Sequence, residues 1–287
     1  MRLPARLSAL AATLGLALAS LTAAAPAEAA AHYPGGVLAK GAALEDASTG
    51  SMLWSRKLNT ERPMASITKV MTALLVLQAG ELTQRIKVPA GVTGYVKEHD
   101  ASNAGLHPGD WLTARELLEG LLLPSGADAA YTLAKAYGPG LTKFIAKMNT
   151  EAAALGMTHT HFANFDGLPY PTEYTTYSTP ADLITLGVAA MKYTAFRTIV
   201  DQRNYQLAGN ARHHAYFWRN TNTLLKSYPG AIGIKTGNTL AAGYCLLFAA
   251  QRNGVLLIGV VLHSSGTVQS DSFADATRIL NWGFRHT

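Results

Sequence analysis

The chain has 287 residues, a formal net charge of +6 and one cysteine, Cys245, so an intramolecular disulfide is excluded. This length suits one large domain or two subdomains that share a chain. The basic balance fits anionic surroundings such as a bacterial wall. The sequence contains no basic run with interleaved aromatic residues, the pattern that would indicate nucleic acid binding. It also contains none of the glycine motifs that would indicate a nucleotide site.

The first thirty residues have the pattern of a secretory signal peptide. Arg2 and Arg6 precede an apolar run over residues 7–21, and Ala27-Glu28-Ala29 has the small-x-small form of a cleavage site. The alternative is a membrane anchor, but the run is shorter than the ~20 residues that a spanning helix needs. We therefore predict a signal peptide over residues 1–29 and an exported chain, residues 30–287, without a transmembrane anchor.

The first half of the exported chain begins with strands and continues with helices. Residues 37–45 and 51–55 are predicted strands around a turn, and a helix runs from Ser66 to about Ala79, where Gly80 ends it. Residues 91–109 show no hydrophobic period and predict a long loop over a site. The next helix is expected to begin at a capping box, Thr113 to Glu116. Three further helices are expected over residues 127–136, 141–155 and 179–191.

The last third of the chain changes character. Residues 199–207 are strand-like, and the apolar runs 243–250 and 255–262 flank Asn253-Gly254, which is a strong hairpin signal. Residues 271–284 form an amphipathic helix. The order predicts an α/β part, about residues 32–90 and 195–287, with a mainly helical part inserted at about 91–194. A cleft between the two parts is a natural place for a site.

Ser66 and Lys69 are three residues apart at the start of the first predicted helix. On a helix this spacing places both side chains on one face, about 5–6 Å apart at Cβ. A serine hydroxyl is a weak nucleophile until a base takes its proton. A lysine whose pKa is lowered by burial or by other cations can be that base. Taken alone, the pair also fits a helix-capping serine beside a solvated lysine.

Two further motifs follow in order. Ser125-Gly126-Ala127 stands at a break between helices, and Lys235-Thr236-Gly237 follows an apolar run and precedes Asn238. Ser-x-x-Lys, a middle serine motif and Lys-Thr-Gly are the signatures of penicillin-interacting serine enzymes. Together with the stretches 162–168, 177–182 and 233–244, they make the chain resemble the D-alanyl-D-alanine carboxypeptidases. These are low-molecular-weight penicillin-binding proteins of peptidase family S11. The resemblance covers roughly residues 39–282.

The resemblance implies a β-lactamase/transpeptidase-like fold, an α/β (α+β) architecture in which an antiparallel sheet is flanked by helices. It also implies the roles of the site residues. Ser66 attacks the peptide carbonyl, Lys69 accepts the proton of Ser66, and Ser125 relays a proton to the leaving D-alanine. The expected substrate-binding residues, which contact the terminal carboxylate, form the oxyanion hole or leave room for the peptide, are Lys235, Thr236, Gly237 and Asn238.

The chain departs from the family pattern at Ala127. The middle motif of the family usually ends in asparagine, whose amide helps to hold the substrate, and alanine has neither donor nor acceptor. The balance between hydrolysis and transpeptidation is therefore open. We expect a slower or more specialised enzyme.

Two other functions remain as alternatives. A serine β-lactamase shares these motifs but needs a base for rapid deacylation, and neither Glu151 nor Glu173 lies in the Glu-x-x-x-Asn context of such enzymes. The other alternative is a non-catalytic wall-binding protein, against which the intact motifs argue. His159-x-His161 has the spacing of metal ligands but no evident third ligand, and His213-His214 is interpreted as a surface loop pair.

The resemblance therefore predicts a secreted, cell-wall-associated serine peptidase that needs no cofactor and no metal. Its partners would be peptidoglycan stem peptides ending in D-Ala-D-Ala and, as covalent inhibitors, β-lactam antibiotics. We expect it to act as a monomer. The chain ends soon after Trp282, so the resemblance predicts neither the C-terminal β domain nor the membrane-binding helix of many relatives.

Overall fold

The structure, a computed structural model, describes residues 33–287, which form one compact unit. The predicted signal peptide lies outside the described residues. Within residues 33–287 no single helix is both long and apolar enough to cross a membrane, although the bent pair α6 (Pro180–Met191) and α7 (Thr194–Val200) passes this test on length and composition together.

A five-stranded antiparallel sheet in the order β2-β1-β11-β10-β9 forms the centre of the fold. Its strands are β1 (Gly41–Asp46), β2 (Ser51–Arg56), β9 (Ala231–Thr239), β10 (Gly243–Arg252) and β11 (Val255–Leu262). Both predicted hairpins are confirmed. Asn253 and Gly254 adopt the positive φ angles, 49° and 84°, that a tight hairpin turn requires. The pairing of β1 with β11 joins the first and last parts of the chain.

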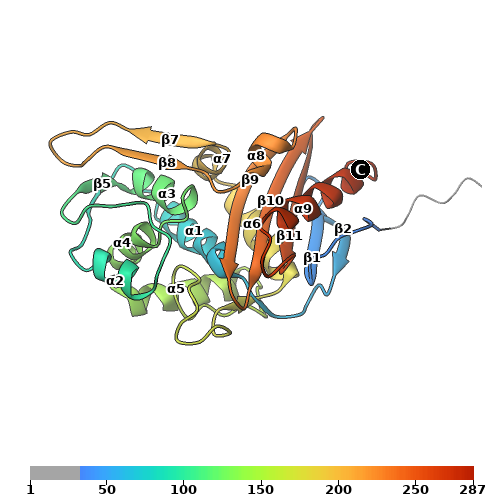
Figure 1. Cartoon of the computed structure of the whole chain (residues 1–287), viewed down its shortest axis with the longest axis horizontal. Helices are drawn as coiled ribbons and strands as arrows, with labels where there is room; N and C mark the ends of the chain where they lie inside the picture. Colours follow the sequence, from blue (N-terminus) through green and yellow to red (C-terminus); the bar gives the residue numbers. More distant parts are fainter. Residues whose placement is uncertain (1–32) are drawn as a thin grey trace, which may run out of the picture. The chain divides into compact units, whose positions relative to one another are not determined.

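Helices cover both faces of this sheet (Figure 1). On one face α9 (Ser270–Gly283) packs its apolar side on β10 and β11. On the other face α6 (Pro180–Met191) packs on β1 and β11, and α1 (Lys69–Ala79) packs on α6. Buried side chains of these elements form two cores, one on each side of the sheet. The predicted helices 66–79, 179–191 and 271–284 are confirmed within a few residues.

Four further helices lie on the side of α1 away from the sheet, where three of them pack on α1 and α2 packs on α4 (Figure 1). They are α2 (Val92–Glu98), α3 (Ala114–Leu122), α4 (Ala127–Tyr137) and α5 (Leu141–Ala154). Thr113 and Glu116 form the predicted capping box at α3, with both reciprocal hydrogen bonds present. The short elements are β3 (Arg62–Pro63), β4 (Arg85–Lys87), β5 (Trp111–Thr113), β6 (Tyr177–Ser178) and α8 (Leu224–Ser227).

Two local predictions are wrong. Residues 91–109 are not a continuous loop, because α2 occupies Val92–Glu98. Residues 199–207 are not a single strand. Instead α7 (Thr194–Val200) ends within this range, and only β7 (Asn204–Leu207) is extended, paired with β8 (Tyr216–Arg219). The apolar residues Ile199 and Val200 are buried on a short helix, and an apolar run of this length does not distinguish a helix from a strand.

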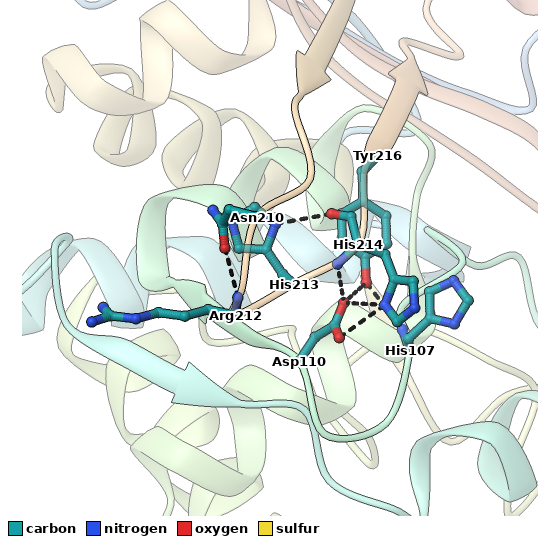
Figure 2. A network of polar contacts seen from close by, with 7 residues as sticks. All are labelled: His107, Asp110, Asn210, Arg212, His213, His214 and Tyr216. Carbon is teal, nitrogen blue, oxygen red and sulfur yellow. Dashed lines mark hydrogen bonds and ion pairs between the residues drawn. The ribbon is translucent and has the colours of Figure 1, made fainter.

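Hydrogen bonds and a ring contact join the hairpin β7–β8 to the loop that precedes β5 (Figure 2). Asp110 accepts hydrogen bonds from Tyr216 and from the main chain of His214, and the His214 ring lies 3.9 Å from that of His107. The indole of Trp218 donates to Ala104 in the same loop at 2.7 Å. The prediction that His213 and His214 are both surface residues is therefore correct only for His214, which is exposed. His213 is buried beside Asn210.

Candidate active site

Ser66 lies in η1 (Ala65–Thr68), a single 3₁₀ turn that leads directly into α1. Lys69, the first residue of α1, is fully buried, and its Nζ lies 2.9 Å from the Oγ of Ser66. The residue before Ser66, Ala65, has a φ of 49°, a conformation that is uncommon outside glycine. The sharp turn at Ala65 thus presents Ser66 beside the amine of Lys69.

The surroundings of Lys69 favour its neutral form. Burial is the main cause, and it lowers the pKa of Lys69 to about 8, while the negative charges of Asp166 and Asp128 oppose this shift. The Nζ atom also donates to the main-chain oxygen of Asp166 at 2.9 Å. A fraction of Lys69 is therefore neutral near pH 7 and has a lone pair available for the Ser66 proton.

Ser125 lies between α3 and α4, where it is buried with a φ of 65°. Two hydrogen bonds to one neighbouring residue hold this turn: the Ser102 hydroxyl donates to the Ser125 carbonyl, and the Ala127 amide donates to the Ser102 carbonyl, both at 2.8 Å. Ala127 itself is fully buried as the first residue of α4.

Strand β9 supplies the wall opposite Ser125. Lys235 is buried, and its pKa is lowered well below the usual value by burial and by the charge of Lys69. Its Nζ donates to the main-chain oxygen of Thr236 at 3.1 Å. Gly237 packs against η1 so closely that a Cβ there would lie 2.8 Å from the oxygen of Met64 and 3.2 Å from the nitrogen of Ser66. Only glycine allows this approach.

These elements enclose a cavity of about 350 Å³. Five of the seven predicted site residues line it, namely Ser66, Ser125, Thr236, Gly237 and Asn238. The other two, Lys69 and Lys235, do not belong to the lining and are buried. The structure thus brings the three sequence motifs together, although they come from η1 with α1, from the α3–α4 turn and from β9.

Several residues of the cavity wall were not predicted from the sequence. Thr221 is one of them, and its hydroxyl lies 2.7 Å from that of Thr236. The others with polar side chains are Asp100, Ser102, Thr239, Tyr244, Gln269 and Ser272. Asp100 and Ser102 belong to the segment 91–109 that was predicted to lie over a site, and Thr239 and Tyr244 belong to the stretch 233–244. Thr221, Gln269 and Ser272 reach the cavity only through the fold, and no local pattern marks them. Cys245 is buried and also borders the cavity.

Asp166 lies next to the site, because its main-chain oxygen accepts a hydrogen bond from the Nζ of Lys69. It is fully buried, and it belongs to the stretch 162–168 on which the family resemblance partly rests. Among residues 33–287 no three His, Cys, Asp or Glu side chains are grouped so that they could hold a metal ion. His159 instead lies 3.6 Å from a carboxylate oxygen of Glu61.

Solved structures with the same architecture identify the class of protein. The crystal structure of the Streptomyces K15 DD-transpeptidase has a TM-score of 0.80 and 42% sequence identity, and the match covers 87% of this chain and 98% of that one. A D-alanyl-D-alanine carboxypeptidase from Mycobacterium tuberculosis has a TM-score of 0.78 and 34% identity, with 86% and 91% covered. The chain therefore has the transpeptidase/β-lactamase fold of the DD-peptidases, as predicted.

The sequence comparisons specify the family within this class. The family model of D-alanyl-D-alanine carboxypeptidases, Peptidase_S11, matches residues 27–266. The D-alanyl-D-alanine carboxypeptidase of Streptomyces sp. strain K15 is 43% identical over 249 residues, which are 82% of this chain and 84% of that protein. DacB2 of M. tuberculosis is 35% identical over 240 residues, 83% and 80% of the two chains. The chain belongs to the D-alanyl-D-alanine carboxypeptidase family of serine peptidases, which confirms the predicted family and enzyme class.

Proposed function

We propose that the chain is an exported serine D-Ala-D-Ala carboxypeptidase that processes peptidoglycan stem peptides through an acyl-enzyme on Ser66. The observation that carries this proposal is the 2.9 Å contact between Ser66 Oγ and the buried Nζ of Lys69, at the wall of a cavity that Ser125 and β9 also line. A nucleophile within hydrogen-bond reach of a base with a lowered pKa is the arrangement that acyl transfer requires.

In the acylation step the O–H bond of Ser66 breaks as its oxygen attacks the carbonyl carbon of the terminal D-Ala-D-Ala bond. The proton passes to Lys69. The oxyanion that forms accepts hydrogen bonds from the main-chain N–H groups of Ser66 and Asn238, and donors of this kind contribute about 2.7–4 kcal/mol each at comparable sites. As the peptide C–N bond breaks, Ser125 donates its proton to the nitrogen of the departing D-alanine and takes the proton held by Lys69 in its place, and the acyl group remains on Ser66.

The wall formed by β9 suits a substrate that ends in a carboxylate. The Thr236 hydroxyl donates to that carboxylate, and the side chain of Lys235 lies directly behind it, with its Nζ 3.5 Å from the Thr236 hydroxyl oxygen. Gly237 leaves room for the peptide to lie along the strand. This wall therefore selects C-terminal residues, which fits an enzyme that removes or exchanges the last D-alanine.

The lining of the cavity disfavours the β-lactamase alternative. Rapid deacylation needs a carboxylate base close to the ester. Glu151 instead accepts a hydrogen bond from Gln78, and neither Glu151 nor Glu173 lines the cavity. Asp100 is the one carboxylate among the residues that line this cavity. We therefore propose that β-lactams acylate Ser66 and leave slowly.

The test is the intact mass of the purified exported chain with benzylpenicillin, beside Ser66→Ala, while loss of the drug is followed in solution. A lasting adduct on the native protein and none on Ser66→Ala would support the proposal, and D-alanine release from a D-Ala-D-Ala peptide would then establish the peptidase reaction. Rapid drug loss without a lasting adduct would favour a β-lactamase. Neither adduct nor drug loss would favour the non-catalytic wall protein.

Hydrolysis and transfer compete for the same acyl-enzyme. The relative from Streptomyces K15 is named a D-alanyl-D-alanine carboxypeptidase among the similar sequences, and a DD-transpeptidase among the similar solved structures. We propose that this chain also transfers the acyl group when an amino acceptor is present. Adding a glycyl acceptor to the D-alanine release assay and measuring the ratio of transferred to hydrolysed product by mass would decide between the two outcomes.

A further inference from the structure

Asp166 lies outside the three catalytic motifs and does not line the cavity, yet it is one of the residues nearest to the base. It is fully buried, and its main-chain oxygen accepts a hydrogen bond from the Nζ of Lys69 at 2.9 Å. This bond and the contact with Ser66 Oγ, also 2.9 Å, together define where the amine of Lys69 lies. Lys69 is thus held between its reaction partner and the backbone of Asp166.

The carboxylate of Asp166 is also fixed. Tyr95 of α2 donates its hydroxyl to Oδ2 at 2.6 Å, and the amide of Leu168 donates to Oδ1 at 3.2 Å. Burial raises the pKa of Asp166, while the positive charge of Lys69 and the donors on both oxygens oppose this rise and favour the ionised form. The carboxylate is therefore a built feature of this loop and not a side chain that solvent could reorient.

The loop that carries Asp166 is itself rigid. Asn164 accepts a hydrogen bond from the amide of Gly167 at 2.7 Å and donates to the carbonyls of Leu168 and Tyr170 at 2.9 and 2.8 Å. Gly167, with a φ of 82°, packs so tightly on η1 that a Cβ there would overlap the oxygen of Ala65. Movement of Asp166 is thus coupled to the turn that presents Ser66.

We propose that Asp166 is a positioning residue of the acylation step, whose buried carboxylate stabilises the ammonium that Lys69 becomes when it takes the proton of Ser66. The inference rests on the proposed function. In that step one O–H bond breaks, one N–H bond forms, and positive charge appears on Lys69 as negative charge develops on the oxyanion. Because Lys69 is fully buried, a nearby carboxylate has to replace the stabilisation that water would give.

The other charged groups around this pair support the assignment to Asp166. Asp166 is the carboxylate with the largest favourable effect on the charge of Lys69, followed by Asp128 of α4. The Asp128 carboxylate accepts main-chain hydrogen bonds from Ala104, Leu106 and Ala129 and so has a separate structural role. The other titratable groups that face the pair are Lys235 from β9, Tyr95 and His99 from α2 and its end, and Tyr170 from the loop after Leu168.

The first experiment measures the second-order rate constant of acylation by benzylpenicillin from pH 5.5 to 10 for the native protein and for Asp166→Asn. Loss of the negative charge makes Lys69 a weaker base. We expect the ascending limb of the profile to move to lower pH by about one unit and the plateau to fall about tenfold or more. A purely structural role would lower the plateau and leave the limb in place, and this result would overturn the proposal.

The matched control is Asp182→Asn. Asp182 is another buried aspartate, but its carboxylate accepts from the hydroxyl of Thr160 and the amide of His159. It is not among the groups that act on the charge of Lys69. This variant should leave the limb unmoved even if it lowers the stability of the fold. A limb that moved equally in both variants would contradict a specific role for Asp166.

A second variant tests the proposal if Asp166→Asn fails to fold, and a second measurement tests it if the native protein forms no adduct. Tyr95→Phe keeps Asp166 but removes a donor that favours its ionised form. A smaller fraction of Asp166 is then ionised, so the limb should move in the same direction by a smaller amount. The titration of Lys69 is also measured directly by NMR on protein labelled at lysine Cε, with the resonance assigned by Lys69→Arg. A lower pKa of Lys69 in Asp166→Asn supports the electrostatic role even if the native protein fails to form an adduct, and an unchanged pKa overturns it.

Discussion

The hydroxyls of Thr221 and Thr236 lie 2.7 Å apart at the wall of the cavity, although the two residues come from different elements. Thr221 follows β8 and is anchored by a hydrogen bond from its amide to the carbonyl of Leu123. Thr236 belongs to the Lys-Thr-Gly motif of β9. The pair joins the hairpin β7–β8 to the wall that the proposed mechanism assigns to the substrate carboxylate.

Removing the Thr221 hydroxyl should weaken substrate binding. In Thr221→Val the shape is nearly kept, but Thr236 loses the partner that orients its hydroxyl. We expect KM for a D-Ala-D-Ala peptide to rise about tenfold, as one lost hydrogen bond to a charged group implies, with a smaller change in kcat. Steady-state kinetics measure this. Thr223→Val, two residues away on the surface, is the control, and an effect of equal size there would contradict the assignment.

The close approach of Gly237 to η1 predicts a steric effect. In Gly237→Ala the new methyl group meets the Met64 oxygen and the Ser66 nitrogen at 2.8 and 3.2 Å. We expect acylation to fall at least about tenfold and the free energy of unfolding to fall by about 1–3 kcal/mol. Rates of adduct formation and urea denaturation check this. Gly94→Ala, where a Cβ meets nothing within 4 Å on the exposed side of α2, should leave acylation unchanged and raise the free energy of unfolding by about 0.5–1 kcal/mol.

Ala127 offers a test of the departure from the family pattern. Its side chain is fully buried at the start of α4, so an amide placed there must find hydrogen-bond partners in the site or destabilise the fold. We expect Ala127→Asn to raise peptide turnover severalfold, because the amide helps to hold the substrate. D-alanine release and the melting temperature are measured together. Unchanged acylation and turnover in a folded variant would contradict the idea that Ala127 makes the enzyme slower.

The lowered pKa of Lys69 predicts the pH dependence of the native enzyme. With a pKa of about 8, the neutral base disappears as pH falls. The acylation rate constant should therefore fall about tenfold per unit well below pH 8 and level off above it. Fluorescent penicillin labelling between pH 5.5 and 10 tests this. A rate that did not change between pH 6 and 8 would show that acylation does not depend on neutral Lys69 as its base.

Local chemistry predicted much of the fold. Gly80 adopts a left-handed φ of 79° at the end of α1, and Thr113 with Glu116 caps α3 as their spacing indicates. The three site motifs can be found in the sequence because each is short and they occur in a fixed order. Their meeting in one cavity depends on the pairing of β9 with β10 and on the packing of η1 against β9.

Long-range contacts account for what the sequence did not indicate. The alternation of buried Tyr216 and Trp218 with exposed residues is a strand signal, but their partners in residues 104–110 are more than a hundred residues away. The proximity of Asp166 to Lys69 and that of Thr221 to Thr236 likewise arise only after folding. A sequence pattern indicates the spacing of buried residues and the positions of turns, whereas packing determines these long-range side-chain contacts.

Glu119 predicts how the stability of the fold depends on pH. Its side chain is buried in α3, where Gln202 donates to both carboxylate oxygens at 3.1 and 3.0 Å and Arg115 lies 3.9 Å away. Burial is the main cause that raises its pKa to about 7 from 4.5. Because the unfolded chain loses this proton more readily, the stability contributed by the protonated form is complete below about pH 4.5. It is then lost progressively as pH rises to about 7, by about 3 kcal/mol in total.

Glu119→Gln removes this ionisation and should remove its share of the pH dependence. We expect the variant to gain stability relative to the native protein between pH 5 and pH 8, and to exceed it at pH 8 by up to about 3 kcal/mol, because native Glu119 is then ionised in a buried position. Urea denaturation at both pH values measures the difference. Glu116→Gln, on the same helix, should keep the native pH dependence. An unchanged pH dependence in Glu119→Gln would show that Glu119 is not the group responsible.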